Sequence, residues 1–221
     1  GPFRQVFIQP AAGDEGGCLG AAALAHRRLT GSRVEQQPLR HLYLGPQWSN
    51  DAIRQLLNAT ELPYLSFAGR EEELLGAVVE HLVAGAVVGW FHGRMEFGPR
   101  ALGARSILAN PMGEQVREQI NRKVKRREPF RPFAPSVLST EAGAHFALDH
   151  PSPFMLETCA VRSPLPLPAI THVDGSARPQ TVQPADSPRF AVLLTRFFQR
   201  TGCPLLLNTS FNVKDEPIVC S

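Results

Sequence analysis

Short apolar segments alternate with helix-like segments along this chain, and glycine or proline separates most of them. The apolar runs at residues 86–91 and 204–207 are typical of buried strands. Helical patterns cover residues 70–84 and 188–201, and each of them ends at a glycine. Because strands and helices alternate irregularly, the sequence predicts an α/β or α+β domain with a mixed sheet and flanking helices.

The composition is that of a chain that can bury a core. Hydrophobic residues make up 43% and charged residues 19% of the 221 positions, which disfavours disorder. The sequence contains neither an apolar run long enough to cross a membrane nor the pattern of a secretory signal, so we expect a cytoplasmic protein without a membrane partner. Four cysteines without a CxxC pair indicate reduced thiols rather than a structural zinc site.

Cationic residues are concentrated in the middle of the chain. Residues 94–131 contain ten Lys or Arg and four Glu, whereas the rest of the chain is net acidic. This density indicates an anionic partner, which can be a phosphate, a nucleotide or a nucleic acid. A solvated basic face explains the same charges, so charge alone leaves these interpretations open.

Arginines and glycines interleave in the segment GRMEFGPRALGARS, residues 93–106. Glycines let a backbone approach a ligand closely, and arginine donates paired hydrogen bonds to phosphate or carboxylate. Glu96, within the same segment, is expected to orient one guanidinium group. The alternative is a tight structural turn that carries surface arginines.

Two further segments combine cations or small polar groups with a rigid frame. In residues 123–133 the prolines would hold Arg131 in a fixed direction, as a preorganised anion site requires, and they place any strand over residues 131–138 at an edge or interrupt it. The polar run at residues 208–212 follows an apolar strand, where ligands bind in open α/β sheets. A nucleic-acid patch or a solvated face for the first segment, and turn chemistry for the second, are the alternatives.

Two weaker signals complete the set. A turn within residues 172–180 brings Asp174, Ser176 and Arg178 close together, but no nucleophile elbow surrounds the serine. Asp14 lies in a glycine-rich turn before a helix, where a carboxylate can hold a metal or serve as an N-cap. Fixed cations and small polar donors are common to most of these segments, which favours phosphoryl or nucleotidyl chemistry by positioning and charge stabilisation.

The chain resembles the C-terminal part of the NodU/TobZ/CmcH O-carbamoyltransferases. Residues 1–45 resemble the end of that family's actin-like N-terminal domain, and residues 46–221 resemble its YrdC-like domain, truncated at the C-terminus. Four segments in family order carry the resemblance: GRMEFGPRALGARSILANP (93–111), INRKVKRREPFRPFAPSVL (120–138), THVDGSARPQTV (171–182) and LLLNTSFNVKDEPIV (205–219).

The resemblance implies a fold and a reaction. The YrdC-like domain is a twisted mixed α/β sheet with flanking helices and a concave basic face. It uses ATP, with Mg²⁺, and carbamoyl phosphate to form carbamoyl-adenylate, releasing pyrophosphate and phosphate. The N-terminal domain, which holds an iron-type metal, then passes the carbamoyl group to a hydroxyl of a small molecule of antibiotic or lipo-oligosaccharide type.

The family's ligand contacts can be carried over onto matching positions. Of these, Lys125, Arg131 and Arg178 are expected to act in catalysis. Asp14 would correspond to a metal-holding carboxylate whose partner ligands lie outside this chain. The expected contacts to carbamoyl phosphate and the nucleotide are Arg100, Lys125, Arg131, Arg178, Asn208, Ser210 and Asn212.

A basic-groove RNA-binding module of the same fold, without catalytic activity, is the alternative function. RNA-binding grooves interleave cations with exposed aromatic residues on which bases stack. In this chain fixed turns interrupt the basic stretch instead, so we expect nucleic acid not to be the partner.

Overall fold

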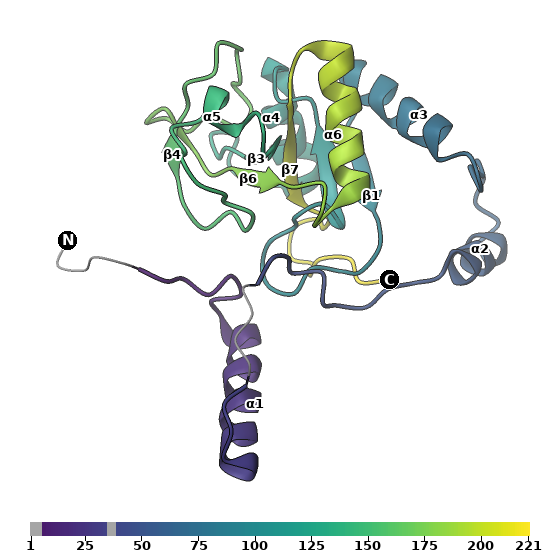
Figure 1. Cartoon of the computed structure of the whole chain (residues 1–221). Helices are drawn as coiled ribbons and strands as arrows, with labels where there is room; N and C mark the ends of the chain where they lie inside the picture. The colour runs from purple at the N-terminus through teal and green to yellow at the C-terminus, as the bar shows by residue number, and fades with distance from the viewer. Residues whose placement is uncertain (1–5, 35–38) are drawn as a thin grey trace.

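The structure is a computed structural model, and it describes residues 6–34 and 39–221 (Figure 1). At its centre lies a five-stranded mixed sheet in the order β1-β2-β7-β3-β6. Every neighbouring pair is antiparallel except β3 and β6, which are parallel, so the predicted mixed α/β architecture is confirmed. The strands are β1 (Val88–Phe91), β2 (Arg105–Ala109), β3 (Ala134–Leu138), β6 (Gln180–Val182) and β7 (Leu205–Ser210), with a separate ribbon of β4 (Cys159–Ala160) and β5 (Ser176–Ala177).

Two long helices, α3 (Glu71–Val83) and α6 (Pro188–Thr201), lie side by side against the sheet (Figure 1). The buried residues of α6 recur at helical spacing, so that one stripe faces the core. Gly202 ends α6 with a φ of 73°, a left-handed conformation that suits glycine. The predicted helix over residues 188–201 is therefore confirmed at both ends.

The segment after β2 begins as α4 (Glu114–Gln119) and continues as a π-helical turn, η1 (Ile120–Lys125). Asn121 and Lys125, both polar, are buried in this wider turn. π-helical turns are rare and occur often at functional sites. At its end, Arg126 adopts a φ of 44°, which stops the helix and redirects the chain.

The strand β3 lies inside the sheet, between β7 and β6, so the prediction of an edge or interrupted strand is wrong. Ser139 donates its backbone N–H to Val182, which shows that odd-numbered residues of this segment face β6. The missing N–H of Pro135 therefore falls before the first β3–β6 pair, Ser136 with Gln180. An interior strand tolerates a proline at a point where the neighbouring strand has not yet begun.

The N-terminal part reaches the body through a connector. The helix α1 (Asp14–Thr30) contains no buried residue and projects from the body, and α2 (Asn50–Ala59) also buries none (Figure 1). By contrast, connector residues 42–46 exchange backbone hydrogen bonds with Met95 and Phe97. The domain boundary near residue 45 stays a prediction. One further short helix, α5 (Ala142–His145), follows β3. None of the described helices is long and apolar enough to cross a membrane.

Candidate functional site

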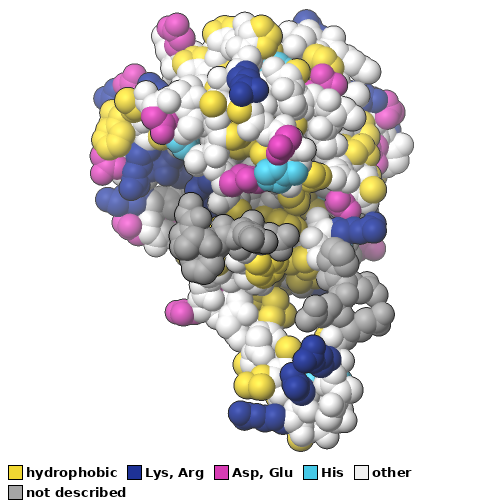
Figure 2. Space-filling model, turned by 60° about the vertical axis from the view of Figure 1, so that its left-hand side comes forward, with side chains coloured by type: hydrophobic (Ala, Val, Ile, Leu, Met, Phe, Trp, Pro, Cys, Tyr) yellow, Lys and Arg dark blue, Asp and Glu magenta, His cyan; other side chains and the backbone are white. Residues whose placement is uncertain are grey.

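Two adjoining cavities open at the end of β7, and Figure 2 shows Lys and Arg side chains gathered around a hollow on one flank of the body. Their volumes are about 420 and 150 Å³, and Arg127, Thr209 and Ser210 line both. Two carboxylates, Glu128 and Asp215, line the larger cavity, and none lines the smaller one among the described residues. The seven cationic side chains around the two cavities are Arg100, Lys125, Arg126, Arg127, Arg131, Arg178 and Lys214.

All seven residues predicted to contact ligands line one or both of these cavities. The strand β7 runs to Ser210, so Asn208 and Ser210 belong to the strand rather than following it, which corrects the sequence interpretation. The structure brings the predicted residues together, while their roles stay predictions. Arg100, Arg178 and Asn208 line the smaller cavity, Lys125, Arg131 and Asn212 line the larger one, and Ser210 lines both.

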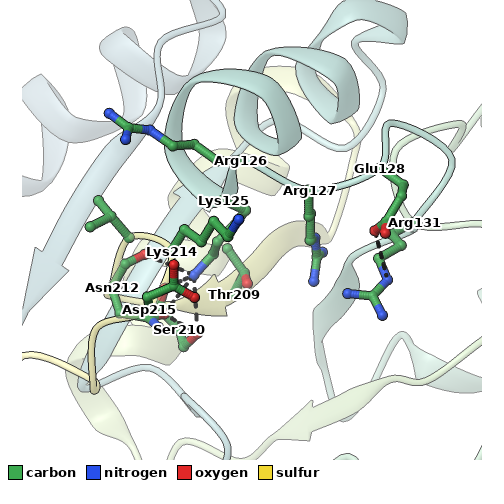
Figure 3. A pocket seen from close by; sticks show the side chains of 11 residues that line it. Lys125, Arg126, Arg127, Glu128, Arg131, Thr209, Ser210, Asn212, Lys214 and Asp215 are labelled. Carbon is green, nitrogen blue, oxygen red and sulfur yellow. Dashed lines mark hydrogen bonds and ion pairs between the residues drawn. The ribbon is translucent and has the colours of Figure 1, made fainter.

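Lys125 is tied to the end of β7 by four contacts (Figure 3). Its Nζ lies 2.6 and 3.1 Å from the carbonyl oxygen and Oγ of Ser210, and 3.0 and 2.7 Å from the carbonyl oxygen and Oδ1 of Asn212. Burial, together with the positive charge of Arg127, lowers the pKa of Lys125 to about 8. The lysine thus fixes Ser210 and Asn212 at the cavity wall and places a cation there without a carboxylate partner.

Arg127 is a site residue that the sequence analysis missed. Its Nε donates to Asn121 Oδ1 at 2.7 Å, and its guanidinium lies over the Phe133 ring at 4.7 Å from the centroid. No described residue accepts a hydrogen bond from its Nη groups, and burial lowers its pKa. Arg127 therefore presents two amino groups where the cavities meet, while the side chain of Arg126 points away from it (Figure 3).

The side chain of Arg131 is less constrained than its prolines suggest. The Asn121 amide holds the backbone carbonyl of Arg131 at 2.8 Å. However, the side chain is 55% exposed, and its Nε pairs with Glu128 at 3.5 Å (Figure 3). The expected fixed direction is therefore confirmed for the backbone but not for the guanidinium.

Two side chains that line the smaller cavity each have a buried polar atom that the protein leaves unpaired. Arg178 Nε is buried without a hydrogen-bond partner, and so is Asn208 Oδ1. The Nδ2 group of Asn208 is fully used, because it donates to Ala101, Ser136 and the side chain of Gln180. A buried polar atom without a partner costs about 1–3 kcal/mol, so a ligand that pairs with both atoms gains that free energy.

Arg100 and Arg178 bring two positive charges to this small cavity. Burial lowers the pKa of Arg178, and the neighbouring charge of Arg100 lowers it further. Among the described residues that line the cavity, none is a carboxylate that could offset this repulsion. The arrangement is therefore suited to an anion such as a phosphate group.

Glu96 does not orient a guanidinium directly. Its buried carboxylate accepts hydrogen bonds from the backbone N–H groups of Leu102, Ala104 and Arg105.

Gly103 lies in the turn that these N–H groups form. It has a φ of 107°, and a Cβ there would lie 2.4 Å from the Phe190 ring. The glycine is thus required both by the backbone conformation and by the contact with α6.

Asp14 lies exposed in the first turn of α1, and Gly13 rather than Asp14 is the N-cap. In the part of the chain that the structure describes, no three His, Cys, Asp or Glu side chains form a group that could hold a metal ion. One carboxylate alone does not make an iron-type site, so the metal role of Asp14 stays a prediction. Of the two carboxylates at the larger cavity, Glu128 is paired with Arg131.

Comparison with known families defines the class. The family described as carbamoyltransferase C-terminus matches residues 79–221, and the chain belongs to this family. The matched part includes every residue that lines the two cavities, all seven cationic side chains among them, and the five strands of the sheet, β1, β2, β3, β6 and β7.

Three relatives illustrate the range of the family. The chain is 45% identical to an uncharacterised protein of Synechocystis sp., with 100% of this chain and 40% of that protein covered. It is 42% identical to the nodulation protein NolO of Bradyrhizobium diazoefficiens (100% and 41% covered). It is 38% identical to the 3'-hydroxymethylcephem-O-carbamoyltransferase of Amycolatopsis lactamdurans (99% and 40% covered). The chain thus spans about 40% of the length of these relatives.

Among solved structures, full-length HypF in a phosphate- and nucleotide-bound form overlaps 65% of this chain and 21% of its own. The TM-score of this overlap is 0.47, at 17% sequence identity.

Proposed function

We propose that this chain is the part of an O-carbamoyltransferase that binds ATP and carbamoyl phosphate and forms carbamoyl-adenylate, and that its mixed sheet is of the YrdC-like type. The observation that carries the proposal is the excess of seven cationic side chains over two carboxylates around two adjoining cavities. Membership of the carbamoyltransferase C-terminal family supports it. Two ligands that both bear phosphate need such an excess of fixed positive charge.

The proposed reaction consumes one water molecule. Water attacks the phosphorus of carbamoyl phosphate, and the bond between phosphorus and the carbamoyl oxygen breaks. Phosphate and carbamate are the products. A carbamate oxygen then attacks the α-phosphorus of ATP, the bond to the β-phosphate oxygen breaks, and pyrophosphate leaves. The chain's contribution is to hold the two anions together and to stabilise the negative charge that builds up between them.

The two cavities suggest how the ligands divide. The larger cavity, about 420 Å³, has room for a triphosphate beside Lys125, Arg127 and Arg131. The smaller cavity, about 150 Å³, fits the carbamoyl group, whose NH₂ can donate to Asn208 Oδ1 and whose carbonyl can accept from Arg178 Nε. Arg127 and Ser210, which line both cavities, lie where the two ligands would react.

The second step, transfer of the carbamoyl group to an acceptor hydroxyl, is proposed for proteins of the relatives' full length. One relative is named for carbamoylation of a hydroxymethylcephem and another for nodulation, which accords with an acceptor of antibiotic or lipo-oligosaccharide type. The chain spans about 40% of the length of these relatives, so we propose that the acceptor site lies in the part of the relatives that this chain does not cover.

A calorimetric titration tests the proposal. The 221-residue chain is titrated with ATP–Mg²⁺ and with carbamoyl phosphate, and in parallel with a short single-stranded RNA at two salt concentrations. We expect saturable binding of both small ligands and weak RNA binding that collapses with salt. RNA binding without a response to either small ligand would contradict the proposal and favour the RNA-binding alternative. Phe130, which is 64% exposed and precedes Arg131 in the chain, could then offer a ring on which a base stacks.

A further inference from the structure

Glu96 is a buried carboxylate whose hydrogen bonds all go to one loop. It is 4% exposed, and its Oε1 lies 2.6 Å from the backbone N of Leu102 and 2.7 Å from that of Ala104. The N–H of Arg105 lies between its two oxygens, at 3.3 and 3.1 Å. Backbone N–H groups that converge on a carboxylate compensate the cost of burying its charge.

The backbone on either side of Glu96 is itself fixed. Met95 donates its N–H to Pro46 and accepts from Gly45, at 2.8 and 2.9 Å. Phe97 donates to the carbonyl oxygen of Leu42 at 2.7 Å. Glu96 is therefore a firm anchor point, and the loop from Ala101 to Arg105 is the part that it holds.

The same loop is held from its other side by sheet residues. The carbonyl oxygen of Ala101 accepts from Asn208 Nδ2 at 3.1 Å, and that of Leu102 accepts from Gln180 Nε2 at 2.7 Å. The residue just before this doubly held stretch is Arg100, which lines the smaller cavity with Arg178. Two guanidinium groups repel one another there, so Arg100 would move toward solvent if its loop were released.

We propose that Glu96 is a positioning residue that holds Arg100 at the smaller cavity and thereby sets the affinity of this site for the phosphate-bearing carbamoyl ligand. The inference rests on the proposed function, because it takes carbamoyl phosphate to be the ligand of Arg100. Glu96 lines neither cavity and contacts the loop only through its backbone N–H groups, so it would act through that backbone.

The test is a double-mutant cycle on carbamoyl phosphate affinity, measured by calorimetry on the 221-residue chain. In Glu96→Gln the side-chain amide places an N–H₂ group against backbone N–H donors, so the loop loses part of its anchor. We expect Glu96→Gln and Arg100→Ala each to weaken binding about tenfold or more. Because both changes act on one contact, the double variant should bind within about twofold of Arg100→Ala alone.

Controls separate positioning from loss of stability. Val79→Ala removes core volume from α3, which lines neither cavity, and should lower the melting temperature without changing affinity. If Glu96→Gln does not fold, Glu96→Asp keeps the charge at shorter reach and enters the same cycle. Independent, additive losses in the double variant, or unchanged affinity in a folded Glu96 variant, would overturn the inference. Failure of the unmodified chain to bind carbamoyl phosphate would instead overturn the proposed function.

Discussion

The two cavities differ in how far the protein satisfies its own polar groups. At the larger cavity Lys125 has four acceptors, and Arg131 is paired with Glu128. At the smaller cavity Arg178 Nε and Asn208 Oδ1 have no partner, and no described lining residue is a carboxylate. The larger cavity thus has two of its cations, Lys125 and Arg131, already paired within the protein, whereas two residues of the smaller cavity keep a buried polar atom without a partner. Affinity should therefore depend most on the smaller cavity.

The largest expected effect follows from Arg178→Ala. This change removes a guanidinium with an unpaired buried Nε, and we expect carbamoyl phosphate binding to weaken by about 2–4 kcal/mol in a calorimetric titration. Arg162→Ala, at an exposed arginine that lines neither cavity, is the matched control and should leave affinity unchanged. Equal affinity of the Arg178 variant and the unmodified chain would remove the smaller cavity from the site.

The next effect concerns which acyl group is accepted. Asn208→Ala removes the acceptor that would pair with the carbamoyl NH₂, and acetyl phosphate lacks that NH₂ group. We expect the unmodified chain to prefer carbamoyl over acetyl phosphate about tenfold, and the variant to lose most of this preference. Competition binding measures the ratio, which a general loss of stability would leave unchanged. A preference that survives in Asn208→Ala would place the carbamoyl group elsewhere.

The stability of the folded chain should depend on pH through Lys125, which lines the larger cavity. The pKa of Lys125 is about 8 in the folded chain and about 10.5 when unfolded, so the unfolded state binds more protons between these values. Stability should therefore rise with pH across this window, by on the order of 1–3 kcal/mol relative to Lys125→Met. Urea unfolding of both proteins at pH 7 and pH 10 measures the difference. Parallel stabilities at the two pH values would show that Lys125 is not held as a buried cation.

Arg131→Ala should have the smallest effect. A buried clamp at this position would predict a loss of several kcal/mol, but the guanidinium is 55% exposed and already paired with Glu128. We expect ATP and carbamoyl phosphate affinities to fall by about 0–1 kcal/mol. Arg122→Ala, at an exposed arginine that lines neither cavity, is the control and should leave both affinities unchanged. A loss as large as that of Arg178→Ala would reverse the proposed ranking of the cavities.

The sequence predicts the parts of this structure that local rules determine. The helix over residues 188–201 has a proline at its start, a periodic apolar stripe and a terminal glycine, and all three signals agree. The residues that gather at the cavities could be named from their motifs. Which cavity each residue lines could not, because that depends on the pairing of β7 with β2 and β3.

Other features depend on contacts between distant segments. Arg126 and Arg127 are indistinguishable as letters in a basic run, and the left-handed backbone at Arg126 is what separates them. Glu96 was expected to face a guanidinium, since charge pairing is the simplest partner for a carboxylate, but backbone N–H groups of the folded loop take that place. The prediction of an edge or interrupted strand at Pro135 was wrong for the same reason, because whether the strand tolerates this proline depends on where β6 begins.

The position of carbamoyl phosphate in a crystal of the 221-residue chain tests the central claim most directly. The account predicts the carbamoyl group in the smaller cavity, with its NH₂ within hydrogen-bond distance of Asn208 Oδ1 and its carbonyl oxygen next to Arg178 Nε. The phosphate should lie toward Arg100 and Arg127. A ligand bound only beside Lys125 and Arg131, with Arg178 Nε and Asn208 Oδ1 still unpaired, would contradict it.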